Sequence, residues 1–289
     1  MIVKLAIWLL LGCWSVTVAA EQLHVLVVQS DSSVLYQTFA RNYTQNLPAN
    51  IKVSVLERAE DFNTEQADLI VTIGVRAAEL VADRTAQPLL AAMIPSNFPA
   101  KRSRNFSAIY LDQPWGRQVS VLRAALPERH KIGVLHSVGK DLSALRTELS
   151  SRGETLIDRT LRSDESLFSA LDEVLSGSEV LLGVPDSVVY TSNTIRNILL
   201  TSYRRGIPLI GFSPAYVRAG ALYAVFSTPE QLAAQAGDIT LSFAQTRKLP
   251  DAQFPALYTI AVNQDVARTL GLTIKSADAL RLQIEKSSG

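Results

Sequence analysis

The chain has 289 residues, 47% of them hydrophobic, and a formal net charge of +1 at pH 7. That length is ample for one large or two medium domains with cores of their own. The nearly balanced charge argues against nucleic acid as a partner, and a single cysteine, Cys13, excludes disulfides within the chain and metal sites built from several cysteines.

The N-terminus has the pattern of a secretory signal peptide over residues 1–20. Lys4 is the only charge before Glu21, an apolar stretch covers Leu5–Cys13, and small residues precede Glu21. We therefore expect export to the periplasm, with cleavage after residue 20. The exported chain would contain no cysteine, so thiol catalysis is excluded, and its 27 basic residues would equal its 27 acidic ones.

Two alternatives for this segment stay open. A retained membrane anchor needs about 20 apolar residues, and the apolar stretch here is shorter. The sequence Leu10-Leu11-Gly12-Cys13 also resembles a lipobox, in which Cys13 would be lipidated and become the new N-terminus. Because the apolar stretch continues through residues 14–18, we favour a soluble exported protein over a lipoprotein.

Short apolar runs alternate with amphipathic stretches in the first half of the chain. A run of five or six apolar residues predicts a buried strand, and apolar residues at helical spacing predict a helix. The predicted strands are 23–28, 51–56, 68–73, 89–94 and, at a sheet edge, 107–111, with helices over 33–47 and 77–83.

The same alternation starts again at Lys131. The predicted strands are 132–136, 155–160, 179–184, 208–212, 222–226 and 257–262, with helices over 142–152, 167–175, 192–205 and 230–247. Continuous apolar strands alternating with helices indicate parallel sheets covered on both faces. Two such series, separated between Pro114 and Pro127, predict an α/β fold with two similar lobes. The alternative is one larger doubly wound sheet.

The residues that follow the predicted strands are the candidates for a binding site. Ligands of open parallel sheets lie beyond the carboxyl ends of the strands, and helices that begin there favour anionic groups. The same small and polar residues also serve as ordinary helix caps. The candidate ligand-binding residues are Ser30, Asp31, Gly74, Val75, Ser96, Ser137, Asp186, Ser187, Phe212, Ser213 and Tyr216.

We expect distinct roles for these candidates. The backbone N–H groups of Gly74-Val75 and Asp186-Ser187 would hold a ligand carboxylate, and Asp186 would accept a hydrogen bond from a ligand amine. Phe212 and Tyr216 either stack on an apolar part of the ligand or pack in the core.

The sequence argues against an enzyme. The stretch from Gly211 to Ala215 resembles a nucleophile elbow around Ser213, but Pro214 has no N–H for an oxyanion hole. No histidine follows His136, where the usual order of such triads places the base. The three scattered histidines do not form a metal set, and no dinucleotide-binding glycine pattern is present. We expect no catalytic residue, no metal and no cofactor.

Several motifs of the second half occur in an order and spacing typical of one family. They are Val184-Pro185-Asp186-Ser187, Gly206 to Phe212, Ala219-Gly220-Ala221-Leu222, Gln235-Ala236-Gly237, and Val262-Asn263 with Ala267 and Leu270-Gly271-Leu272. In the first half, the segment from Ala67 to Gly74 adds a further match. With these motifs the chain resembles ABC-transporter substrate-binding proteins related to tryptophan- and tyrosine-binding lipoproteins.

The resemblance implies the periplasmic binding protein type I fold, in which two Rossmann-like lobes with parallel sheets are joined by a hinge. It places residues 21–113 and 228–250 in one lobe, and residues 114–227 and 251–289 in the other. It also implies a periplasmic solute-binding protein of an ABC importer. The ligand would be small and polar or amino-acid-like, the membrane partner would be an ABC permease, and nucleic acid would have no role.

One departure from the family keeps an alternative open. Val75 stands where the family has a threonine, so the site loses a hydroxyl in the first lobe. The alternative is a periplasmic sensor or adaptor of the same fold that signals to a membrane receptor or kinase.

Overall fold

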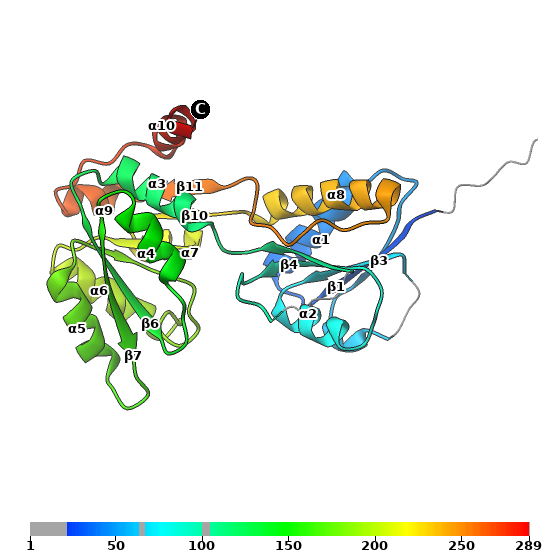
Figure 1. The fold of residues 1–289 in the computed structure, drawn as a ribbon, viewed down its shortest axis with the longest axis horizontal. Coiled ribbons are helices and arrows are strands. Elements are labelled where there is room, and N and C mark those ends of the chain that lie inside the picture. The colour runs from blue at the N-terminus through cyan, green and yellow to red at the C-terminus, as the bar shows by residue number, and fades with distance from the viewer. Residues whose placement is uncertain (1–21, 64–66, 100–104, 289) are drawn as a thin grey trace, which may run out of the picture.

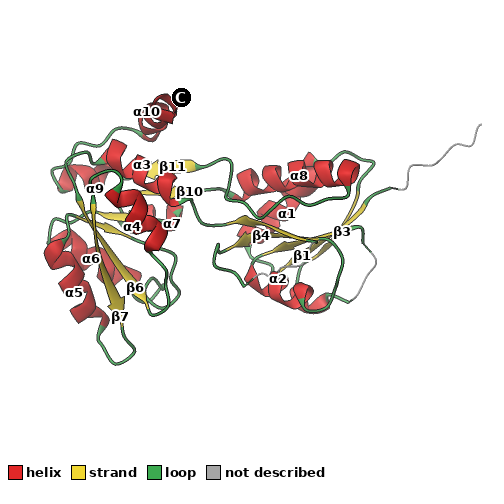
Figure 2. Cartoon of the chain, in the orientation of Figure 1, coloured by secondary structure: helices red, strands yellow, loops and turns green. Residues whose placement is uncertain are grey.

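The computed structural model describes residues 22–63, 67–99 and 105–288, and the predicted signal peptide lies outside them. These residues form two sheets with helices on both sides, set side by side along the long axis of the molecule (Figures 1 and 2). We call the unit around the first sheet the first lobe and the unit around the second sheet the second lobe. The alternative of one continuous sheet is therefore wrong.

The first sheet has the strand order β2-β1-β3-β4-β5, and all its pairs are parallel. Its strands and the neighbouring helices are β1 (His24–Gln29), α1 (Val34–Asn46), β2 (Lys52–Leu56), the 3₁₀ turn η1 (Ala59–Asp61), β3 (Leu69–Ile73), α2 (Val75–Ala82), β4 (Leu89–Ile94) and β5 (Phe106–Tyr110). The predicted edge strand is confirmed as β5.

Alternate residues of these strands serve two different cores. Val25 and Val27 pack on the side covered by α1 and α8 (Pro229–Thr246), whereas Leu26 and Val28 pack on the side covered by α2. Because both faces are covered, the strands have the continuous apolar sequences that the sequence pattern predicted.

The second sheet has the order β11-β10-β9-β8-β6-β7. Its strands are β6 (Lys131–Ser137), β7 (Thr155–Leu161), β8 (Val180–Leu182), β9 (Leu209–Gly211), β10 (Tyr223–Phe226) and β11 (Thr259–Val262). β11 runs antiparallel to β10, so the prediction of a purely parallel sheet is wrong for this strand. An apolar run alone does not encode strand direction.

The helices of the second lobe are α3 (Trp115–Ala125), α4 (Ser143–Ser150), α5 (Leu167–Gly177), α6 (Ile195–Arg204), α7 (Pro214–Ala219), α9 (Gln264–Thr269) and α10 (Ala277–Ser288). The sequence did not predict α3, α7, α9 or α10. None of the described helices is both long and apolar enough to cross a membrane.

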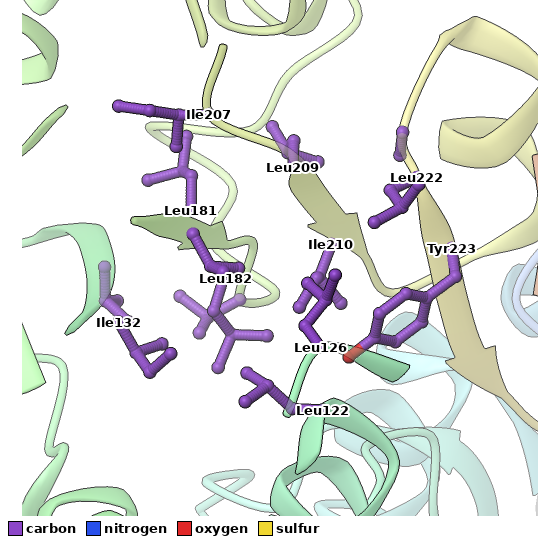
Figure 3. Close-up of a cluster of buried hydrophobic side chains, with 14 of the residues drawn as sticks. Leu122, Leu126, Ile132, Leu181, Leu182, Ile207, Leu209, Ile210, Leu222 and Tyr223 are labelled. Carbon is purple, nitrogen blue, oxygen red and sulfur yellow. The ribbon is translucent and has the colours of Figure 1, made fainter. Parts of the chain in front are cut away.

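Leucine and isoleucine side chains fill the core of the second lobe around Tyr223 (Figure 3). Tyr223 is fully buried, and its hydroxyl has no hydrogen-bond partner among the described residues. Burial raises the pKa of Tyr223 far above its ordinary value because an ionised phenol would lose its hydration there.

Three segments cross between the lobes in the described part of the chain: 111–114 after β5, 227–228 before α8, and 247–258 between α8 and β11. The third segment continues along the edge of the first sheet. The N–H of Gln253 donates to the Ala108 carbonyl at 2.8 Å, and the N–H of Tyr110 donates to the Gln253 carbonyl at 3.0 Å. The predicted lobe boundaries at 113/114, 227/228 and 250/251 stay predictions.

Candidate functional site

A cavity of about 160 Å³ lies where the two lobes meet beside the crossing segments. Its lining residues come from loops after strands of both sheets, from α3 and from the third crossing segment. They are Ser96, Asn97, Asp112, Gln113, Trp115, Gln118, Gly139, Lys140, Asp141, Pro185 and Phe254.

The first lobe contributes the loops after β4 and β5 to this cavity. The backbone N–H of Ser96 donates to the carboxylate of Asp112, which joins the two loops. The loop after β4 leaves its strand through an irregularity, because the pairing register with β5 shifts between Ala92 and Ile94, and Met93 has a φ of 57°. Such a bulge bends the strand end and redirects the residues that follow, here Ser96 and Asn97.

The second lobe contributes the loops after β6 and β8. The Nζ of Lys140 donates to the Pro185 carbonyl at 3.0 Å, so one cavity residue holds another. The carboxylate of Asp141 accepts a hydrogen bond from the backbone N–H of Ser143 at 2.8 Å, just where α4 begins. This hydrogen bond lowers the pKa of Asp141, which therefore carries its negative charge at neutral pH.

The wall nearest the crossing segments is aromatic and amide in character. Trp115 begins α3, and Phe254 belongs to the third crossing segment, with its ring edge-on to Tyr110 at a centroid distance of 5.3 Å. Gln113 and Gln118 complete this wall, and both are buried. The cavity thus joins charged groups, amides and two large rings in a small volume.

Comparison with known proteins decides the family. The model of the ABC transporter substrate binding protein family matches residues 43–280, which is most of the chain. The chain belongs to this family. It is a solute-binding protein of a non-catalytic family, so membership favours transport over the sensor or adaptor interpretation.

Solved structures share this fold over nearly their whole length. A domain from Streptococcus pneumonia in complex with L-Trp is 18% identical with a TM-score of 0.64, covering 88% of this chain and 96% of that one. A conserved domain protein from Vibrio cholerae is also 18% identical with a TM-score of 0.64, covering 91% and 98%. A ligand-free, open substrate-binding protein with adhesive properties from Clostridium difficile is 16% identical with a TM-score of 0.71, covering 88% and 96%. A search of curated protein sequences finds no match.

Of the candidate ligand residues of this substrate-binding protein, Ser96 lines the cavity. Ser137 ends β6, two residues before the lining residue Gly139, and Asp186 directly follows the lining residue Pro185. Asp186 accepts from the N–H and the hydroxyl of Ser137 and from the N–H groups of Val188 and Val189. Burial alone would raise the pKa of Asp186, but these hydrogen bonds outweigh it and hold the pKa below its ordinary value. Its carboxylate is therefore charged and fully engaged within the chain. Neighbouring Ser187 is exposed.

Four candidates lie at strand ends of the first lobe but do not line the cavity: Ser30, Asp31, Gly74 and Val75. The hydroxyl of Ser30 donates to the Ile73 carbonyl and accepts from the Ala77 N–H, so it joins β3 to α2. The N–H of Gly74 is used by the Ala92 carbonyl at 2.9 Å. Asp31 accepts from the Ser33 N–H at 2.8 Å just before α1. Ligand contact by these residues stays a prediction.

Phe212, Ser213 and Tyr216 also lie outside the cavity lining. Phe212 and Tyr216 pack against each other at a centroid distance of 4.4 Å and both contact the ring of Tyr190. The Tyr216 hydroxyl donates to the Tyr190 carbonyl at 3.2 Å, and burial raises the pKa of Tyr216 to about 12. In this conformation the rings pack in the second lobe, as one of the two predicted roles requires, and stacking on a ligand stays a prediction.

Two of the three histidines, His24 and His136, lie in strands of the two sheets. The Nε2 of His24 lies 3.0 Å from the Ser54 hydroxyl, between β1 and β2. His136 is buried in β6, where its Nδ1 lies 2.9 Å from the Ser137 carbonyl. Across the described residues, no cluster of histidine, cysteine and acidic side chains has the arrangement of a metal site.

The alternation of strands and helices does not predict the cavity residues between 112 and 118, because this stretch separates the two series. A helical signal is present in it. Trp115, Val119, Leu122 and Leu126 are spaced by four, three and four residues, and the last three are buried in the second lobe. This spacing indicates the helix α3, which begins at Trp115, but not the burial of Gln113 before it.

Proposed function

We propose that this substrate-binding protein captures a zwitterionic, amino-acid-like solute in the interlobe cavity and delivers it to an ABC permease. One observation carries the proposal: Asp112 from the first lobe and Lys140 from the second line the same cavity. A free amino acid presents an ammonium and a carboxylate a few ångströms apart, and each would find the opposite charge on a different lobe.

Contacts to both lobes also explain how such a ligand would close the protein. A ligand that binds the closed arrangement better shifts the population towards it, and closure is a rigid-body rotation about the crossing segments. The cavity lining holds two carboxylates, Asp112 and Asp141, and one ammonium, Lys140. This balance favours a ligand with an amine over a simple anion.

The rings of Trp115 and Phe254 would contact an apolar side chain of the ligand. The relative with bound L-Trp supports an amino acid as the ligand, and the two rings favour one with an aromatic side chain. Ser30, Gly74 and the other first-lobe candidates outside the cavity lining would contact the ligand only after closure.

The proposal includes export and the absence of catalysis. Residues 1–20 would direct the chain to the periplasm, where it would act without a cofactor and without lipid on Cys13. Mass spectrometry of the exported protein tests the cleavage site and the absence of lipid. An N-terminus at Glu21 supports this assignment, whereas a diacylglycerol on Cys13 contradicts it.

The ligand is tested with purified protein against the natural amino acids, small sugars and simple anions. A bound ligand raises the melting temperature by mass action, by an amount set by its concentration and Kd. Titration calorimetry then gives the Kd of each hit. Binding of an amino acid supports the proposal, and binding of only sugars or anions contradicts it.

Variants then assign the ligand to the cavity. Asp112→Asn and Lys140→Gln should each weaken amino-acid binding at least tenfold, because a hydrogen bond to a charged group contributes about 1.5–3 kcal/mol. Asp265→Asn is the matched control, since the Asp265 side chain is 86% exposed on α9 and lies outside the cavity lining. Unchanged affinity in both cavity variants would place the ligand elsewhere.

A further inference from the structure

One polar network joins all three segments that cross between the lobes. Gln113 belongs to the first segment, and its Nε2 donates to the hydroxyl of Ser227 in the second segment at 2.9 Å. The Ser227 hydroxyl donates in turn to the carbonyl of Leu257 in the third segment at 2.6 Å. Gln113 and Ser227 are both buried, so these hydrogen bonds are shielded from competing water.

Arg117, in the first turn of α3, completes the network. Its Nη1 donates to the Gln113 Oε1 at 2.6 Å and to the Pro255 carbonyl at 2.9 Å. The guanidinium carbon lies 4.5 Å from the centre of the Tyr258 ring, within range of a cation–π interaction. Arg117 has no carboxylate partner among the described residues. Its guanidinium instead contacts neutral groups of the crossing segments, namely the Gln113 side chain, the Pro255 carbonyl and the Tyr258 ring.

The network also reaches the cavity. Gln113 lines the cavity with its neighbour Gln118, whose Nε2 donates to the Gln113 carbonyl at 3.3 Å. Phe254, another lining residue, directly precedes Pro255, which Arg117 holds. The same hydrogen bonds therefore fix the crossing segments relative to one another and fix one wall of the cavity.

We propose that Arg117 is a positioning residue that, through Gln113, fixes the pivot of the hinge and the cavity wall built on it. A hinge motion changes backbone angles in a few residues of the connecting segments, so a side chain that ties those segments together at one point restricts the possible rotations. Without Arg117 the segments move independently, and the lobes sample a wider range of relative orientations. The consequence for ligand affinity rests on the proposed function, whereas the consequence for the hinge does not.

The test measures the distance between the lobes in ligand-free protein. Spin labels are attached at Glu79→Cys on α2 and Ser169→Cys on α5, both exposed positions, in a Cys13→Ser background that removes the only native cysteine. Electron double resonance gives the distribution of distances between the labels. We expect a broader distribution for Arg117→Ala and for Ser227→Ala than for the parent, and a parent-like distribution for Ser227→Thr, which keeps the hydroxyl.

Arg123→Ala is the matched control on the same helix. The Nη1 of Arg123 lies 2.9 Å from the carboxylate of the buried Glu154, and both residues belong to the second lobe. Loss of this ion pair should lower the melting temperature and leave the distance distribution unchanged. If Arg117→Ala behaves in the same way, with a lower melting temperature and the parent distribution, the network only stabilises the fold and the proposal is overturned.

Titration calorimetry with L-tryptophan as the probe tests the link to the ligand. Arg117→Ala should weaken binding about tenfold although Arg117 is not a cavity-lining residue, because less of the free protein holds the competent cavity. Arg117→Lys keeps the charge but loses the planar guanidinium that lies over the Tyr258 ring, so its affinity should lie between those of the parent and Arg117→Ala. Unchanged affinity in Arg117→Ala contradicts the link. Failure of the parent to bind any amino acid contradicts the proposed function, while the distance measurement still decides the hinge.

Discussion

Asp186, on the loop after β8, accepts hydrogen bonds from both the backbone N–H and the hydroxyl of Ser137 at 2.8 Å each, although the two residues are 49 positions apart. These bonds tie the end of β6 to the loop that follows β8. Because Lys140 and Pro185 in the same two loops line the cavity, the pair positions the second-lobe wall of the site. Within the family-like motif 184–187, Asp186 therefore has a structural role that does not depend on a ligand.

The first prediction concerns the dependence of stability on pH. The pKa of Asp186 is lower in the folded protein than in the unfolded chain, so its charge stabilises the fold at neutral pH. That contribution is complete above the unfolded pKa of about 3.9 and is lost as the pH falls through the lower folded pKa. Asp186→Asn should cost about 2 kcal/mol at pH 7 and progressively less below about pH 4.

Urea unfolding at pH 7 and at pH 3 measures this difference. Asp265→Asn is again the control, since a substitution at such an exposed position should change stability by less than about 0.5 kcal/mol at either pH. A loss for Asp186→Asn that is equal at both pH values would show that its charge does not contribute.

The second prediction concerns the turn from β3 into α2. Gly74 has a φ of 87°, and a Cβ atom there would lie 2.6 Å from both the Ser30 hydroxyl and the Tyr36 hydroxyl. Gly74→Ala therefore combines backbone strain, about 1 kcal/mol, with a steric clash against the Ser30 and Tyr36 side chains. We expect a total loss of about 3 kcal/mol, measured by thermal unfolding.

Gly153→Ala separates the two effects. Gly153 has a similar φ of 81°, but a Cβ atom there would meet no other atom within 4 Å. This variant should lose only the strain of about 1 kcal/mol. If the two variants lose the same stability, Ser30 and Tyr36 move aside without cost and the tight contact at Gly74 has no energetic role.

The fold was largely predictable from the sequence, and the site much less so. Strands such as β3 and β4 are continuous apolar runs because both faces of the sheet are covered, and that pattern is visible in any sequence. The direction of β11 was not predictable, because its residues 259–262 form an apolar run whatever their partner is. The predicted strand ends located the edge of each sheet from which the candidate ligand residues follow.

The position of the cavity depends on where the chain crosses between lobes, and no periodicity encodes this. Asp112 and Gln113 are polar residues in a short connecting segment, and the sequence alone gives them the appearance of a solvated loop. Tertiary contacts bury Gln113 against Ser227, which is 114 positions away. Long-range contacts of this kind follow only from the assembled fold.

The third prediction compares two fully buried tyrosines. The hydroxyl of Tyr43 on α1 lies 2.7 Å from that of Thr240 on α8, whereas the Tyr223 hydroxyl has no partner among the described residues. A buried hydroxyl without a partner loses its hydration with no hydrogen bond in return. Tyr223→Phe should therefore stabilise the second lobe by about 1 kcal/mol, and Tyr43→Phe should destabilise the first lobe by about the same amount.

Chemical denaturation of both variants and of the double variant checks this. The effects should add, since the two tyrosines lie in different lobes, and a loss of stability for Tyr223→Phe would mean that its hydroxyl has a partner, such as a buried water molecule.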